Sequence, residues 1–215
     1  GWAVSSLSPA ARAVSPSADA MVESRRWVAA AFEGTVPPAP TPGMEVLANY
    51  DLIQKNARFG KPLKLAGTKY NRGLFCHANS KIVVRLPSAG KTFEAIVGLD
   101  SNEQTVGGRG SVVSAVQVAG KDAFRSAVLK EGLPAVPVQV DLAGATEFLL
   151  EVNDSGDGIS CDQANWADAK ITLASGQELW LADLAVAGGP AVVDLFDIRN
   201  EQLDYDLLRR LVAQW

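Results

Sequence analysis

The sequence has few of the residues on which most enzyme active sites depend. Its 215 residues include one histidine, two cysteines and two methionines. A Ser-His-Asp or Cys-His site would therefore have to use His77. Cys76 precedes it directly, but neighbouring residues on a strand face opposite sides, so these two cannot form a dyad. No nucleophile elbow, phosphate-binding loop or H-E-x-x-H stretch occurs. A small glycoside hydrolase that uses a carboxylate pair stays an alternative, since 24 acidic residues are present.

Excess positive charge and long apolar runs are also missing. The chain has 20 basic and 24 acidic residues, a net charge of -4, which argues against nucleic acid as a partner. The apolar run at 27–32 is far shorter than the roughly 20 residues that cross a bilayer, so we expect no membrane span. The first residues lack the order of a secretory signal and do not begin with methionine, which indicates a processed or partial chain.

Alternation of apolar and polar residues is abundant in the middle of the chain. Clear runs lie at 82–86, 93–97, 136–142, 147–152 and 169–173, and turn-forming residues separate them. Many short strands with one polar face, and no helical periodicity between them, are typical of antiparallel sheets that pack face to face. We therefore predict an all-β fold, an antiparallel β-sandwich over residues 45–175.

The two flanks have a different character. Residues 17–33 have helical periodicity, and the proline-rich stretch 35–43 excludes helix and central strand, so residues 1–44 are predicted to be a helix and a linker. Residues 176–215 are predicted to be a C-terminal extension that ends in an amphipathic helix at 200–215. Its apolar stripe must be buried, either on this chain or on a partner protein or adjacent domain.

The loop at 152–169 is rich in side-chain oxygens. Asp154 and Asp157 lie among glycines and further acidic and amide residues, the ligand type that calcium prefers, although the spacing is not that of an EF-hand. The same composition is typical of a turn between two strands. A structural calcium ion and a plain turn both stay open.

Two loops that lead into strands carry planar polar groups beside an aromatic ring. Such groups make paired hydrogen bonds to sugar hydroxyls, and an aromatic ring can cover the apolar face of a sugar. His77 has an alternative role in bracing its loop, and Trp166 has an alternative role in the core. We interpret Asp100 and Asn102 as caps of a turn. The candidate carbohydrate-binding residues are His77, Asn79, Asp162, Gln163, Asn165 and Trp166.

The order and spacing of these segments resemble a known family. The most specific parts are G-x-x-x-H-A-N-S, which begins at Gly73, and D-G-x-x-x-D-x-x-x-W-A-D-A, which begins at Asp157. Residues 60–175 resemble the NPCBM family of carbohydrate-binding modules, whose members are appendages of glycoside hydrolases. Gln163 stands where members usually have histidine, and Asn165 where they have aspartate.

The resemblance implies a function and a setting. It implies a jelly-roll-like sandwich, without catalytic activity, that binds galactose-type sugars, has a structural calcium ion and targets an attached or partner glycoside hydrolase. It also implies that the two motif loops flank one site, so Cys76 and Cys161 are candidates for a disulfide, which is typical of secreted or periplasmic proteins. The main alternative is a protein-interaction or structural sandwich that has lost sugar binding and works through the C-terminal helix.

Overall fold

The computed structural model describes residues 41–187. The helices predicted at 17–33 and 200–215 lie outside these residues, as does most of the proline-rich stretch. Within 41–187 the regular secondary structure is strand, apart from one short 3-10 turn, η1 (Leu181–Asp183). None of the helical structure in this range is long and apolar enough to cross a membrane.

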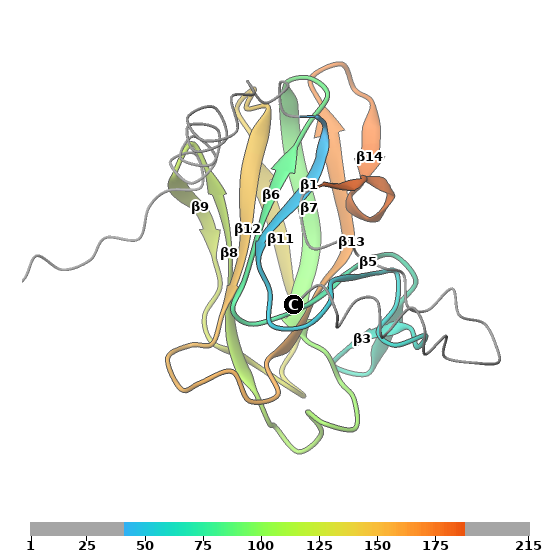
Figure 1. Cartoon of the computed structure of the whole chain (residues 1–215), viewed down its shortest axis with the longest axis vertical. Helices are drawn as coiled ribbons and strands as arrows, with labels where there is room; N and C mark the ends of the chain where they lie inside the picture. The colour runs from blue at the N-terminus through green and yellow to red at the C-terminus, as the bar shows by residue number, and fades with distance from the viewer. Residues whose placement is uncertain (1–40, 188–215) are drawn as a thin grey trace, which may run out of the picture. The chain divides into compact units, whose positions relative to one another are not determined.

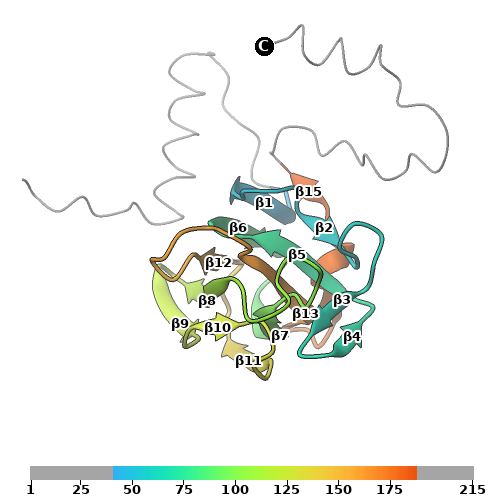
Figure 2. The ribbon, with the colours of Figure 1, turned by 90° about the horizontal axis from the view of Figure 1, so that it is seen from below.

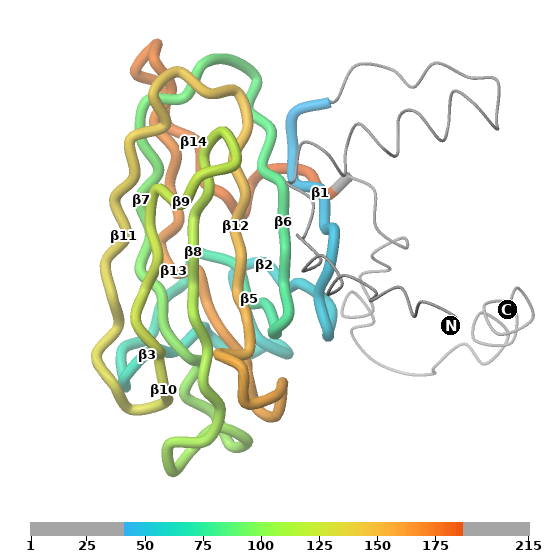
Figure 3. The backbone as a smooth tube through the Cα atoms, turned by 90° about the vertical axis from the view of Figure 1, so that its left-hand side faces the viewer, coloured from blue at the N-terminus to red at the C-terminus, as the bar shows by residue number. Residues whose placement is uncertain are grey.

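Two sheets form the body of the described part. The first has the order β10-β8-β12-β6-β1-β15, with β9 paired to β8, and the second has the order β11-β7-β13-β5-β2, with β14 paired to β13. The strands of the first sheet are β1 (Gly43–Ala48), β6 (Ser80–Arg85), β8 (Ser111–Val118), β9 (Lys121–Arg125), β10 (Leu129–Lys130), β12 (Glu147–Asn153) and β15 (Val186–Ala187). Those of the second are β2 (Gln54–Lys55), β5 (Gly73–His77), β7 (Gly90–Leu99), β11 (Val136–Asp141), β13 (Gln163–Leu173) and β14 (Glu178–Trp180). Figure 3 shows the sheets as two layers, with β11, β7 and β13 in one and β12, β6 and β1 in the other.

The connectivity confirms the predicted sandwich. From β5 to β8, and again from β11 to β13, successive strands alternate between the two sheets. Neighbouring strands are antiparallel, except that β15 runs parallel to β1. This alternation is the connectivity expected of a jelly-roll-like sandwich, in which each strand contributes one face to a shared core.

Trp166 lies in that core. Its side chain is 1% exposed and its ring centroid is 6.1 Å from that of Phe93, which in turn lies 5.0 Å from Phe148 of the opposite sheet. Alternation along β13 explains this position, because Ala164 and Trp166 face inward while Asn165 between them faces outward. The assignment of Trp166 to a sugar-binding surface is therefore wrong, and the alternative core role is correct.

The sandwich extends beyond the predicted boundary at residue 175. β14 pairs with β13, with Trp180 opposite Lys170, and β15 pairs with β1, with Val186 opposite Met44. Strands of two or three residues are too short to show alternation, so periodicity could not reveal them.

Several loops meet at one end of the sandwich. The loops at 101–110 and 154–162 lie together at the lower end in Figure 1, below β7, β8 and β13. Figure 2 views the molecule from this end and shows the small hairpin of β3 (Leu63–Leu65) and β4 (Thr68–Tyr70) at the margin, near β13. Ser111 connects the two loops, since its backbone N donates to Asp162 Oδ1 at 2.7 Å.

This close approach of the loops predicts the effect of a glycine substitution. Gly110 has φ of 80°, and a Cβ there would overlap the carbonyl of Cys161, whereas Gly107 has φ of 87° with nothing within 4 Å of the same position. Both Gly→Ala changes incur the left-handed backbone cost of about 1–2 kcal/mol. Gly110→Ala should lose about 2 kcal/mol more than Gly107→Ala in urea unfolding, because it also separates the loops. Equal losses would contradict this account.

Candidate functional site

The antiparallel pairing of β5 with β13 brings the two motif segments together. In this register His77 is opposite Gln163, and Phe75 is opposite Asn165. Directly opposed residues of an antiparallel pair share a face, so the side chains of His77 and Gln163 lie next to each other on the outer face of the second sheet. The prediction that the two segments meet is confirmed.

Gln163 is the centre of a hydrogen-bond network. Its Oε1 accepts hydrogen bonds from Arg58 Nε at 2.9 Å and from Asn102 Nδ2 at 2.8 Å. Its Nε2 donates to Gln104 Oε1. The side chain is 3% exposed, so its amide is fixed from three directions rather than free in solvent. These hydrogen bonds therefore hold the Arg58 and Gln104 side chains in position.

Asp100 is the anionic anchor of the same network. Its Oδ2 accepts from Asn165 Nδ2 at 2.7 Å and from the backbone N of Lys64 at 3.1 Å, and its Oδ1 accepts from Asn102 Nδ2 at 2.7 Å. Arg58 Nε lies 3.8 Å from Asp100 Oδ1, and the two side chains are 3% and 2% exposed. A buried ion pair is stable only when further hydrogen bonds satisfy it, as they do here. Arg58, Asp100, Asn102, Gln163 and Asn165 are called the Gln163 network below.

Exposed side chains surround this network. Arg58 Nη1 donates to Glu103 Oε1 at 3.1 Å, and Lys61 Nζ lies 3.5 Å from Glu103 Oε2. A backbone hydrogen bond and the Arg58 guanidinium lower the pKa of Glu103 to about 2, so this 59% exposed side chain is a carboxylate at ordinary pH. We call Tyr50, Phe59, Lys61, Glu103 and Gln104 the polar rim.

Two aromatic side chains of the rim are exposed. Tyr50 is 65% exposed and Phe59 is 44% exposed. The Tyr50 ring lies 4.9 Å from the His77 ring, and Arg58 Cζ lies 5.2 Å from the Phe59 centroid. Each exposed ring therefore packs against a buried side chain, which fixes its orientation, as a surface for stacking a sugar requires.

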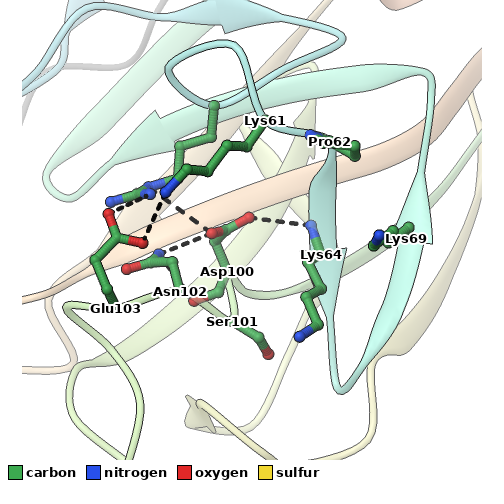
Figure 4. Close-up of a pocket in the computed structure, with 9 residues that line it drawn as sticks. Lys61, Pro62, Lys64, Lys69, Asp100, Ser101, Asn102 and Glu103 are labelled. Atoms are coloured by element: carbon green, nitrogen blue, oxygen red, sulfur yellow. Dashed lines mark hydrogen bonds and ion pairs between the residues drawn. The ribbon is translucent and has the colours of Figure 1, made fainter.

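A pocket of about 240 Å³ opens beside the rim. Figure 4 shows Lys61 above Asp100 and Asn102, with Glu103 to the left and Lys64 and Lys69 to the right. An adjoining hollow of about 320 Å³ shares Lys64, Asn102 and Glu103 with it. Exposed charged and polar groups thus line a concave surface whose floor belongs to the Gln163 network.

The other candidate residues brace the loops. His77 is 4% exposed, and its Nδ1 lies 2.9 Å from the carbonyl oxygen of Ala78. This contact agrees with the alternative role of His77 in bracing its loop. Asn79 is exposed, and its Oδ1 accepts from the backbone N of Asp154 at 3.2 Å. Asp162 is 0% exposed and holds Ser111. Asn165 is 1% exposed, so both Asp162 and Asn165 are too buried to touch a ligand without rearrangement.

Arg58 and Glu103 were not predicted as site residues. Arg58 lies in an irregular segment between Asn56 and Phe59, both at positive φ, where no periodicity marks a buried position. Asn102 does cap its turn, since its Oδ1 accepts from the backbone N of Gln104 at 2.8 Å. The same side chain also joins the network, which a turn pattern does not reveal.

Comparison with known proteins agrees with this geometry. The NPCBM/NEW2 domain family matches residues 43–172, more than half of the chain. The chain belongs to this family. Residues 43–172 are therefore a non-catalytic module of the carbohydrate-binding type, as the resemblance implied.

Individual relatives are similar over more than half of the chain. The CBM51 module of Clostridium perfringens GH95, solved in complex with methyl-galactose, is 30% identical with a TM-score of 0.54, over 59% of this chain and 92% of that one. A structure of the M60 catalytic domain with two CBM51 domains of Clostridium perfringens ZmpB is 32% identical with a TM-score of 0.54, over 60% of this chain and 14% of that one. A Renibacterium salmoninarum protein named "Putative endo-alpha-N-acetylgalactosaminidase" is 35% identical over 112 residues, which are 52% of this chain and 7% of that protein.

The acidic loop of this NPCBM domain does not form a cluster of acidic metal ligands. Asp157 accepts hydrogen bonds from Ser111 Oγ at 2.5 Å and Ser155 Oγ at 3.2 Å, and Asp154 Oδ1 accepts from the backbone N of Gly156 at 3.1 Å. Residues 41–187 contain no group of three or more His, Cys, Asp or Glu side chains placed to hold a metal ion. These contacts are those of a hydrogen-bonded turn.

The implied disulfide is also absent. Cys76 and Cys161 are both free. Cys76 points into the core, where burial raises the pKa of its thiol to about 12, while Cys161 lies in the loop before β13 with φ of 64°. Although Cys76 is opposite Ala164 in the register, its side chain is on the inner face, away from that loop.

The network predicts the effect of restoring the usual family residue at position 165. Asn165→Asp replaces the donor to Asp100 with a second buried carboxylate, so we expect a loss of about 2–4 kcal/mol at pH 7. The loss should shrink near pH 4, where the pair binds a proton. Asn56→Asp is the matched control, because the Asn56 oxygen accepts from Gly73 N and a carboxylate can do the same. Urea unfolding at both pH values measures the difference; equal stability of the two variants would contradict the assigned contact.

Asp162 predicts a pH dependence of stability. Burial, with smaller contributions from Asp157 and Asp154, raises its pKa from 3.8 to about 6, although the Ser111 N–H and His77 act in the opposite direction. Its Oδ2 is buried without a hydrogen-bond partner. The folded state therefore binds the proton more tightly than the unfolded state, and this contribution to stability is lost as pH rises from about 4 through 6.

Thermal unfolding of the wild type and Asp162→Asn between pH 4 and 7 tests this assignment. The amide variant keeps an oxygen for the Ser111 N–H and has no carboxyl to titrate. We expect it to gain stability relative to the wild type as pH rises. Parallel curves would show that Asp162 has an ordinary pKa.

Proposed function

We propose that this NPCBM domain binds galactose-type glycans at the polar rim and the adjoining pocket. One observation carries the proposal: the two motif segments pair so that the Gln163 network fixes the exposed Glu103 and Gln104 side chains, while exposed aromatic rings pack against His77 and Arg58. Sugar sites combine fixed planar hydrogen-bonding groups with an aromatic surface. The rim offers both, since Arg58 contacts the Glu103 carboxylate and the Phe59 ring, and Gln163 holds the Gln104 amide.

Pre-organisation supports binding by exposed side chains. Arg58 holds Glu103 from below, and Gln163 holds Gln104, so little side-chain entropy is lost when a hydroxyl pair binds. A single shallow sugar site of this kind gives a Kd of roughly 10 μM to 1 mM. Gln163, in place of the usual histidine, keeps donor and acceptor capacity, and the network uses both.

The galactose class is supported by a relative and by sugar chemistry. The similar Clostridium perfringens CBM51 module was solved with methyl-galactose. The axial O4 of a galactose-type ring leaves one ring face apolar, which suits Tyr50 or Phe59, while adjacent hydroxyls suit a bidentate carboxylate such as Glu103.

If the module is attached to a catalytic domain, sugar binding would target that domain to its glycan substrate. A similar module occurs with the M60 catalytic domain in a solved structure, and another similar segment is 7% of a much longer protein. A module tethered to an enzyme raises the effective concentration of glycan at the active site. In this proposal the protein is secreted or periplasmic, where such glycans are found.

Substitution of Glu103 tests the site. Glu103→Gln removes the anionic acceptor, and we expect the affinity for methyl galactoside to fall about 10-fold or more. Glu178→Gln is the matched control, since Glu178 is 56% exposed against 59% for Glu103, and each pairs with a lysine. β14, which carries Glu178, lies about 30 Å along β13 from Gln163.

Isothermal titration and NMR with methyl galactoside, N-acetylgalactosamine and glucose measure these affinities. We expect the first two to bind and glucose to bind weakly. Loss on Glu178→Gln but not on Glu103→Gln would move the site elsewhere. No binding of any sugar at millimolar concentration, together with self-association or capture of a protein partner, would favour the protein-interaction alternative.

A further inference from the structure

The β3–β4 hairpin places two lysines directly opposite each other at the mouth of the pocket. Lys64 of β3 pairs with Lys69 of β4. The hairpin turn is Ala66-Gly67, with φ of 45° and 89°, and positive φ at both central residues defines a two-residue turn that fixes this register. Like charges in such a pair are destabilising, so the hairpin places them together at a cost.

The backbone of β3 brings these two side chains close. Lys64 N donates to Asp100 Oδ2 at 3.1 Å, and Lys64 O accepts from Ser101 N at 2.8 Å. The backbone groups of Lys64 are therefore directed to the loop and not to β4, so Lys64 and Lys69 form a non-hydrogen-bonded pair. In antiparallel strands the side chains of such a pair lie closer together than those of a hydrogen-bonded pair. Through Asp100, the lysine pair is fixed to the Gln163 network.

No acidic side chain among the described residues neutralises this pair. Glu103 is paired with Arg58 and Lys61, and neither Lys64 nor Lys69 forms an ion pair within residues 41–187. The pocket is lined by four basic side chains and two acidic ones, Asp100 and Glu103, although the whole chain has a net charge of -4. Glu131 borders only the adjoining hollow. The pocket is thus a local excess of positive charge beside the polar rim.

We propose that the glycan bound by this chain carries an anionic group, a sulfate ester or a carboxylate, which lies between Lys64 and Lys69. The inference rests on the proposed sugar site and specifies its ligand class. An anion between the two ammonium groups removes their repulsion and gains two charge-assisted hydrogen bonds. Lysine acts as a point charge, so either a sulfate or a carboxylate satisfies the pair.

Titration of the full chain with neutral and anionic galactosides tests the proposal. The probes are lactose, a sulfated methyl galactoside with its neutral parent, and sialyllactose. At low salt we expect at least one anionic sugar to bind about 5- to 10-fold more tightly than its neutral parent. The two anionic probes separate sulfate from carboxylate. The preference should vanish near 1 M salt, where the Debye length is about 3 Å.

Variants connect the preference to the lysine pair. Lys64→Gln with Lys69→Gln should abolish the anionic preference, measured as the ratio of the affinities for an anionic sugar and its neutral parent. Lys121→Gln, which changes an exposed lysine on β9, should leave that ratio unchanged. Lys69→Gln alone should not lower the melting temperature, because it relieves repulsion. The melting temperature of the double variant, measured in the same way, distinguishes a lost preference from unfolding.

The possible failures are distinguishable. Lactose binding with no gain for either anionic sugar overturns the anionic preference and leaves the proposed function intact. A preference that survives the double substitution places the anion elsewhere and also overturns the inference. Absence of binding by neutral and anionic sugars alike overturns both proposals.

Discussion

The pairing of β5 with β13 is the constraint on which the site depends. It aligns His77 with Gln163 and gives each strand one inward and one outward face. Inward residues such as Cys76 and Trp166 fill the space between the sheets, while Gln163 and Asn165 face outward beneath covering loops. A shift of one residue in this register would exchange the two faces and place amides in the core.

The outward face is unusual because it is polar and yet buried. The segment around Arg58 and the turn at Asn102 cover it, so Arg58, Asp100 and Gln163 exchange hydrogen bonds that water would otherwise supply. Such a network specifies one arrangement, because a partly satisfied arrangement leaves a buried charge or amide unpaired. Rigidity of this layer is what fixes the exposed carboxylate of Glu103.

Burial distinguishes the residues that support the site from those that are exposed enough to contact a ligand. His77, Asp162, Gln163 and Asn165 belong to the supporting layer, and the exposed rim comes mainly from other segments. Residues of a family motif can be required because they hold a site together. Such residues lie beneath the binding surface and do not themselves contact a ligand. The exposed surface above that layer is free to differ, and in the proposed site it includes a hairpin with two opposed lysines.

The sequence by itself determined the sandwich and its strands at 82–86, 93–97, 136–142, 147–152 and 169–173, because period-two alternation and turn residues are local signals. The meeting of the two motif segments followed only from the family resemblance. The sequence also indicated sugar chemistry from the residue types near His77 and Gln163. Only the tertiary structure decided which side chains are reachable. Trp166 was placed in the core by its position in the alternation of β13, Cys76 was separated from Cys161 by the face it occupies, and Arg58 and Glu103 joined the site from segments without periodicity. Contacts between residues far apart in sequence depend on register and loop path, and no local pattern encodes either.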